Sequence, residues 1–273
     1  MNKNNKFSSK SIGSDDPKIS YSALDKNIPQ DNELRDYLAN KEETGTARHP
    51  IESELVRIGE ALDSWPRTLM IMPPITLSEG TVKRVIPPLG LAYIAGYLES
   101  VGIPFKILDC VVEGLDTEKL IGYKTWMYGI TDDEIRDYVS EFSPEIVGIS
   151  IMYSSDIHSL YRTAKLVKEI NPDTIVVAGG IHTSIYPREI LTESCEESAS
   201  TIDYIIRGEG EVRFADFIRN IKDGVVDLKA DGLCGWHDGK MFINHQIKTI
   251  QNLDDMPFPA YHHLPMEKYF EFN

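Results

Sequence analysis

Cysteine is scarce in this sequence of 273 residues, which contains three: Cys110, Cys195 and Cys234. They lie too far apart for the C-x-x-C spacing of a zinc or redox site. So few cysteines are typical of a reducing compartment, and we expect a cytoplasmic protein. No apolar run approaches the roughly 20 residues of a membrane-spanning helix, and none follows the positively charged N-terminus as in a secretory signal. We therefore expect no membrane partner.

Positive charge is also in short supply, because 28 Lys and Arg face 43 Asp and Glu, for a formal net charge of −15. Proteins that bind nucleic acid or anionic membranes need a basic face, so this balance disfavours both kinds of partner. With 41% hydrophobic and 26% charged residues, the chain has the composition of a globular protein. Disorder of the whole chain is thereby excluded.

The chain divides into three segments of different composition. Residues 1–50 are polar and lack apolar periodicity, which predicts a flexible extension. Residues 51–225 alternate apolar runs with amphipathic patterns, beginning with a predicted short helix at 51–62. In residues 226–273 the Asp238-Gly239 pair predicts a hairpin, and the proline-punctuated remainder reads as a linker toward another domain.

A doubly wound α/β fold is predicted for the middle segment. Five apolar runs have the character of buried strands, at 68–72, 105–108, 146–152, 174–178 and 204–206. Helical periodicity occurs between and after them, at 91–98, 135–142, 157–167 and 212–221. Nearly continuous apolar strands in β-α units indicate a five-stranded parallel, Rossmann-like sheet with helices on both faces. Ligands of such sheets bind at the carboxyl ends of the strands, so we seek the site there.

Three short motifs, two of which contain glycine, fall at these predicted strand ends. The second strand is followed by Asp109-Cys110-Val111-Val112-Glu113-Gly114, the third ends in Ser150-Ile151-Met152, and the fourth in Gly179-Gly180. Their joint order and spacing resemble the cobalamin-binding domain, whose pattern is D-x-H-x-x-G, then S-x-L or S-x-T, then G-G. The resemblance extends over roughly residues 66–225.

This resemblance assigns a cofactor role to each loop. It implies that Asp109 and Gly114 shape the loop under the corrin ring, and that Ser150 and Met152 occupy the S-x-L positions. The Ser150 hydroxyl would then bond a buried nitrogen of the nucleotide tail. Without Cβ atoms, Gly179 and Gly180 would let the backbone approach the tail closely. His182, just beyond them, is either a tail contact or an ordinary loop histidine.

Val111 departs from the family pattern, because it stands where that pattern has the cobalt-ligating histidine. Its side chain has no lone pair, so we expect base-off cobalamin without a histidine ligand and no metal ligand from this chain. The loss of a strong axial donor would ease reduction of the cobalt.

Three further segments resemble the N-terminal half of cobalamin-dependent radical SAM enzymes of the class B methyltransferase type. They are PPLGLAYIAGYLESVG, the run Gly208-Glu209-Gly210-Glu211, and LDDMPFPAYHHLPMEKYF. The resemblance implies a radical SAM domain, in cis or in trans, that binds SAM and a [4Fe-4S] cluster through C-x-x-x-C-x-x-C. That motif is missing here, so we expect no radical chemistry from this chain alone, which is a truncated, split or freestanding module. Gly208, Glu209 and Gly210 contact the tail or only begin a helix.

Two other functions remain open. A freestanding corrinoid carrier or sensor without enzymatic activity is the main alternative, although Val111 disfavours it. A nucleotide or flavin binder is weakened because no G-x-G-x-x-G or P-loop follows the first strand. The His262-His263 pair has no third metal ligand near it in the sequence, and we do not expect a metal site there.

Overall fold

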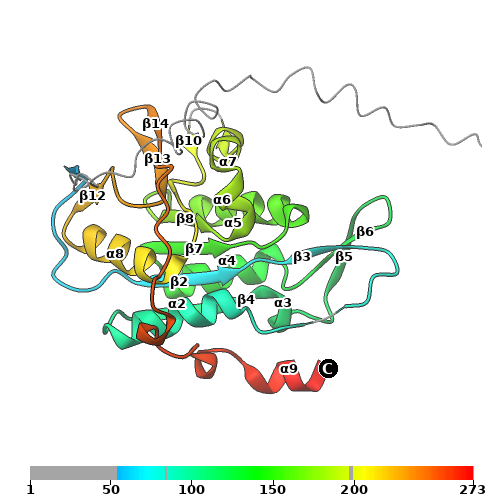
Figure 1. Ribbon diagram of the computed structural model, residues 1–273. Coiled ribbons are helices and arrows are strands. Elements are labelled where there is room, and N and C mark those ends of the chain that lie inside the picture. Colours follow the sequence, from blue (N-terminus) through cyan, green and yellow to red (C-terminus); the bar gives the residue numbers. More distant parts are fainter. Residues whose placement is uncertain (1–53, 84, 197–198, 273) are drawn as a thin grey trace, which may run out of the picture. The chain divides into compact units, whose positions relative to one another are not determined.

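A seven-stranded sheet forms the centre of the computed structural model, which describes residues 54–83, 85–196 and 199–272 (Figure 1). The predicted extension 1–50 lies outside the described residues. The strand order is β14-β13-β11-β8-β7-β2-β4. Five of these strands are parallel: β2 (Thr68–Met72), β4 (Phe105–Asp109), β7 (Ile146–Ser150), β8 (Ile175–Gly179) and β11 (Tyr204–Ile206). The five predicted strands and the doubly wound fold are confirmed.

Helices cover both faces of this sheet, because successive side chains along its apolar strands point to opposite faces. Leu69 and Ile71 pack with α4 (Asp132–Phe142) and α5 (Ile157–Ile170). Met70, between them, packs on the opposite face with α2 (Leu89–Ser100) and α8 (Gly210–Lys222). The four predicted helices are therefore present, and α4 begins with the capping box of Thr131 and Glu134.

The strand order reverses next to β2. From β2 the chain crosses to β4 at the sheet edge, returns to β7 on the other side of β2, and continues outward through β8 and β11. The carboxyl ends of β2 and β7 therefore border the switch point, where doubly wound sheets bind ligands.

The predicted hairpin extends this sheet. Strands β13 (Leu233–His237) and β14 (Lys240–Ile243) are joined by Asp238 and Gly239, whose φ angles are 48° and 71°. Positive φ at both central residues is the requirement of a type I′ turn. The antiparallel pairing of β13 with β11 joins the hairpin to the edge of the parallel sheet.

The helix predicted for 51–62 is wrong over the residues that are described. Strand β1 (Leu55–Arg57) pairs with β12 (Val225–Asp227) instead, and Val56 packs on the core under α8. Leu55, Ile58 and Leu62 had the spacing of a helix face, yet all three are exposed. The pairing with β12, which is remote in the sequence, overrides this local pattern.

A second, three-stranded sheet was not anticipated. It has the order β3-β6-β5 and consists of β3 (Ile75–Ser78), β5 (Glu118–Gly122) and β6 (Thr125–Tyr128). The long connection after β2 is therefore partly a strand. The buried Asp156 carboxylate accepts the backbone N–H of Thr76 at 3.1 Å, which ties this sheet to the segment that follows β7.

Shorter elements complete the described chain. Helix α3 (Cys110–Glu113) follows β4, and α6 (Ile181–Ile185) and α7 (Pro187–Glu193) follow β8. Strands β9 (Cys195–Glu196) and β10 (Ala199–Ser200) form a small antiparallel pair. No helix in the described ranges has the length and apolar character needed to cross a membrane.

The C-terminal segment packs against the domain although its sequence shows no periodic core face. It contains two 3-10 helices, Leu253–Asp255 and Tyr261–His263, and ends in α9 (Met266–Phe272), which lies beside α3 (Figure 1). Ala260, Leu264 and Tyr269 are buried, so this part of the predicted linker contributes to the core.

Candidate functional site

A slot of about 170 Å³ opens at the carboxyl ends of β7, β8 and β11, between helices α2 and α8. Its walls are mainly apolar, and the side chains come from one face of the sheet and from the two helices that cover it. They include Met70, Leu91, Ile94, Val177, Ile206 and Phe214. The slot therefore offers a narrow apolar cavity beside the switch point of the sheet.

Glycines at the strand ends give the slot its space. A Cβ added at Gly179 would meet only the carbonyl oxygen of Ile206, at 3.9 Å, so the backbone tolerates a side chain that would project into the slot. Gly180 differs, because its φ of 105° and ψ of −175° lie in a region essentially restricted to glycine. A Cβ there would overlap the backbone of Ile151.

A buried carboxylate is the main polar feature of the slot. Glu211, in the first turn of α8, lines the cavity, and within the described part of the chain its Oε2 is buried without a hydrogen-bond partner. Burial raises the pKa of the Glu211 carboxyl, and the neighbouring Glu209 raises it further. Buried polar atoms are nearly always paired, so the orphaned oxygen indicates a missing hydrogen-bonding group.

The loops that border the slot are held together by Ser184, which no sequence motif indicates. Its hydroxyl donates to the carbonyl oxygen of Gly180 at 2.7 Å and accepts the backbone N–H of Gly208 at 2.9 Å. The Ser184 carbonyl oxygen accepts Nε of Arg207 at 2.9 Å. No local pattern marks this role, because the two loops are distant in the sequence.

Six of the predicted cofactor residues line the slot together. They are Ser150, Gly179, Gly180, Gly208, Glu209 and Gly210. The run 208–211 is also a helix start, with φ of 76° at Gly208. The Glu209 carboxylate accepts the backbone N–H of Ile250 at 2.6 Å, so Glu209 also anchors the C-terminal segment.

Met152 and His182 do not line the slot but lie in the segments just beyond its strands. Met152 is 51% exposed. Nδ1 of His182 lies 2.9 Å from the Ser154 hydroxyl, which joins the segment after β7 to α6 after β8. Both residues are therefore placed on the surface beyond the carboxyl ends of β7 and β8.

Asp109, Val111 and Gly114 lie apart from the slot, at the edge strand β4. The Asp109 carboxylate caps α3 by accepting the backbone N–H groups of Val111 at 2.9 Å and Val112 at 3.3 Å. Gly114 ends the same helix. Val111 is 6% exposed and belongs to an apolar cluster with Leu264 and Tyr269.

The fold and slot together define a doubly wound α/β domain that can enclose part of a cofactor beside its switch point. A family model described as B12 binding domain matches residues 78–218. The chain belongs to this B12-binding domain family.

Its relatives include cytidylyl-2-hydroxyethylphosphonate methyltransferase of Streptomyces wedmorensis, which is 31% identical over 76% of this chain and 42% of the relative. Anaerobic magnesium-protoporphyrin IX monomethyl ester cyclase of Rubrivivax gelatinosus is 30% identical over 74% of this chain and 34% of the relative. This chain therefore spans less than half the length of either relative.

The structure also resembles that of OxsB, a cobalamin-dependent S-adenosylmethionine radical enzyme solved with aqua-cobalamin bound. The TM-score is 0.55 and the identity 16%, over 76% of this chain and 25% of the OxsB chain. At this identity the likeness concerns the fold alone. The family match and the sequence relatives, among them the cobalamin-dependent radical SAM methyltransferase TokK of Streptomyces tokunonensis at 28% identity over 46% of this chain and 18% of the relative, confirm the predicted relationship to the B12-binding domains of cobalamin-dependent radical SAM enzymes.

Proposed function

We propose that this chain binds cobalamin in the base-off form, with the nucleotide tail in the slot between α2 and α8 and no histidine on the cobalt. The observation that carries the proposal is the slot itself, an apolar cavity with one orphaned buried carboxylate oxygen, from Glu211. We further propose that the domain serves a radical SAM methyltransferase.

The slot fits one end of a benzimidazole nucleotide. An apolar cavity of about 150 Å³ holds a benzene ring, so the present volume suits an aromatic base. Because burial raises the pKa of the Glu211 carboxyl, a proton shared between its orphaned oxygen and a ring nitrogen would satisfy both groups. The Ser150 hydroxyl offers a second polar contact, and Gly179 and Gly180 leave the backbone open to the ribose-phosphate.

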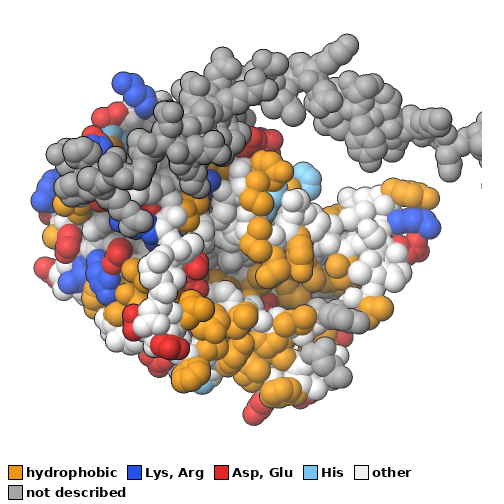
Figure 2. All heavy atoms as spheres, in the orientation of Figure 1, with side chains coloured by type: hydrophobic (Ala, Val, Ile, Leu, Met, Phe, Trp, Pro, Cys, Tyr) orange, Lys and Arg blue, Asp and Glu red, His pale blue; other side chains and the backbone are white. Residues whose placement is uncertain are grey.

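The surface beyond the strand ends suits a flat, largely apolar macrocycle. Five large exposed side chains lie in the segments that follow β7 and β8: Met152, Tyr153, Ile181, Ile185 and Tyr186. Figure 2 shows hydrophobic side chains gathered on the face of the domain that it presents. Contiguous exposed apolar residues mark binding surfaces, and we propose that these receive the corrin.

We propose that the lower face of the cobalt lies over the switch point between β2 and β7. The segment after β2, residues 73–88, contains no histidine, and neither does 109–114. Neither loop could therefore give the cobalt a histidine ligand, and the proposed base-off state rests on the tail base occupying the slot. That Val111 lies beneath the cobalt stays a prediction, and its burial at the sheet edge favours the loop after β2.

Bound cobalamin would supply a cobalt centre that accepts and donates a methyl group. The chain's own residues would hold the tail, exclude water from it and leave the cobalt without an axial histidine, which favours the reduced metal. The methyltransferase relative supports methyl transfer. We propose that the methyl group passes from SAM through cobalt, and that residues 226–273 would lead to a radical SAM domain that binds SAM and a [4Fe-4S] cluster.

The purified protein is expected to bind hydroxocobalamin with the absorption spectrum of the base-off form, because the tail base would occupy the slot rather than the cobalt. Titration at several protein concentrations, followed by gel filtration to separate bound from free cofactor, measures this. Cofactor that elutes entirely free of the protein would refute cobalamin binding. Bound cofactor with the spectrum of the free vitamin would refute the base-off state alone.

Val111→His is expected to leave the bound spectrum unchanged, because residue 111 is buried in an apolar cluster with Val112, Leu264 and Tyr269 and does not line the slot. Absorption of bound cobalamin in wild type and variant measures this, with the unfolding temperature of each as a check on folding. A spectrum of histidine-ligated cobalt in the variant would instead indicate that the lower face of the cobalt lies over the loop at 109–114.

A further inference from the structure

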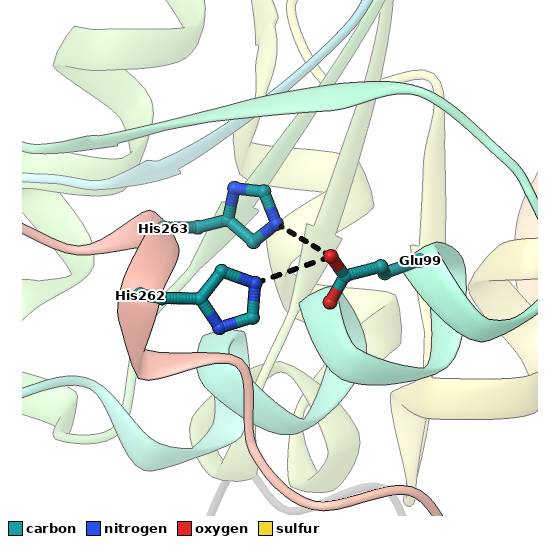
Figure 3. Close-up of side chains that lie close together, drawn as sticks. All are labelled: Glu99, His262 and His263. Carbon is teal, nitrogen blue, oxygen red and sulfur yellow. Dashed lines mark hydrogen bonds and ion pairs between the residues drawn. The ribbon is translucent and has the colours of Figure 1, made fainter.

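The structure brings a third potential metal ligand to the histidine pair of the C-terminal segment. Nε2 of His262 and Nε2 of His263 lie 3.1 and 3.5 Å from the same carboxylate oxygen, Oε1 of Glu99 (Figure 3). All three ligand atoms lie within 4.8 Å of one another. No sequence motif indicates this third ligand, because Glu99 is 163 residues from His262.

The backbone around these side chains is closely fitted. Ala92, Gly96 and Glu99 lie one above another on one face of α2. Along this face the backbone N–H of Ala260 donates to the carbonyl oxygen of Ala92 at 2.8 Å. A Cβ at Gly96 would overlap the carbonyl oxygen of Phe258, so glycine is needed for the approach. Main-chain packing therefore places the two histidines opposite Glu99.

We propose that Glu99, His262 and His263 form a binding site for a divalent transition metal ion such as Zn²⁺. Two imidazoles and one carboxylate are a recurrent ligand set for zinc, which leaves a fourth position for water. With zinc–ligand bonds of about 2.0–2.2 Å, ligand atoms in a tetrahedral site are about 3.3–3.5 Å apart. Both measured separations from Oε1 of Glu99 are close to that spacing.

The site differs from the proposed cobalamin site in residues and in chemistry. It lies at the C-terminal end of α2 and on the C-terminal segment, whereas the slot is lined by the beginning of α2. A bound ion would fasten residues 258–263 to α2. Metal binding would therefore stabilise the packing of the C-terminal segment on α2, whether or not cobalamin is present.

The test is titration of tag-free, cobalamin-free protein with Zn²⁺, followed by calorimetry at pH 7.5. We expect one equivalent to bind, and the double variant His262→Ala, His263→Ala to bind it more than about tenfold more weakly. The matched control is His237→Ala, His245→Ala, which removes two histidines elsewhere and should bind as wild type does. Because metal ligands bind in their deprotonated form, binding should weaken as the pH is lowered.

Two further measurements guard against misfolded variants and non-specific binding. Glu99→Gln keeps a polar group of the same size but removes the charge, so it should weaken Zn²⁺ binding while circular dichroism stays unchanged. The electron paramagnetic resonance spectrum of Cu²⁺ in place of Zn²⁺ should show nitrogen hyperfine coupling that the double variant loses. No binding to wild type, or equal binding to the double variant and its control, overturns the proposal.

Discussion

Replacing Gly179 by valine is expected to weaken cobalamin binding strongly while the protein stays folded. The backbone admits a Cβ at this position, with the carbonyl oxygen of Ile206 at 3.9 Å, and the side chain would extend into the cavity that we assign to the tail. A filled slot cannot enclose the base, so we expect affinity to fall by more than about 100-fold, or about 2.8 kcal/mol. Hydroxocobalamin titration measures this, and the unfolding temperature checks folding.

Gly180→Ala is the matched comparison for Gly179→Val. It adds a smaller side chain at the next residue, where the backbone conformation favours glycine. The φ of 105° and the overlap with Ile151 require the backbone to move. We expect a loss of folding stability on the order of 3 kcal/mol, measured by urea denaturation. If Gly179→Val binds cobalamin as wild type does, the tail is not in this slot and the Gly-Gly pair is only a turn.

The parts of the fold that were predicted from sequence are those set by local patterns. Strands such as 68–72 are short apolar runs between turns, and the helices carry their own periodicity and caps. The Asp238-Gly239 turn needs positive φ at two residues, which this dipeptide readily adopts. These signals lie within a few residues of the elements that they define, so no knowledge of tertiary packing is required.

The missed elements depend on partners that are remote in the sequence. Strand β1 is stabilised by β12, and β3 by β6, and neither pairing can be read from its own residues. The same limit applies to the site. Ser184 joins two loops of the slot, and Glu99 contacts His262, which lies 163 residues away in the sequence. Such contacts become visible only when the chain is folded.

The pattern at 109–114 shows how a motif can have two physical origins. An Asp followed five residues later by Gly matches a cobalamin loop, but it also matches a short helix with an N-terminal cap and a terminal glycine. In the structure Asp109 caps α3 and Gly114 ends it. The helix cap and helix end therefore explain the residues of this loop. By contrast, no group among the described residues satisfies the orphaned oxygen of Glu211 in the slot.

Tyr269→Phe is expected to destabilise the domain by about 1–3 kcal/mol, because it leaves a buried carboxylate oxygen without its donor. The Tyr269 hydroxyl donates to Oδ2 of Asp109, and both residues are buried. Urea denaturation of wild type and variant measures the loss. Tyr123→Phe is the control, because that side chain is 89% exposed and its hydroxyl should contribute little.

The same variant has a pH dependence whose sign is fixed by Asp109. Burial raises the pKa of its carboxyl, and the hydrogen bond from Tyr269 opposes this, so the variant should raise that pKa further. When a carboxyl has a higher pKa in the folded than in the unfolded state, the protein loses stability as the pH rises from the unfolded-state pKa to the folded-state pKa. The destabilisation by Tyr269→Phe should therefore be larger at pH 8 than at pH 5.

Cobalamin affinity of folded Tyr269→Phe separates the two interpretations of the Asp109 loop. If Asp109 only caps α3, which packs against α9, the affinity for cobalamin at a temperature well below unfolding should equal that of wild type. If the loop instead shapes the lower corrin face, loss of the Tyr269 hydrogen bond would displace it and weaken binding in parallel with stability. Because Asp109 lies at edge strand β4, outside the slot, we expect the first result.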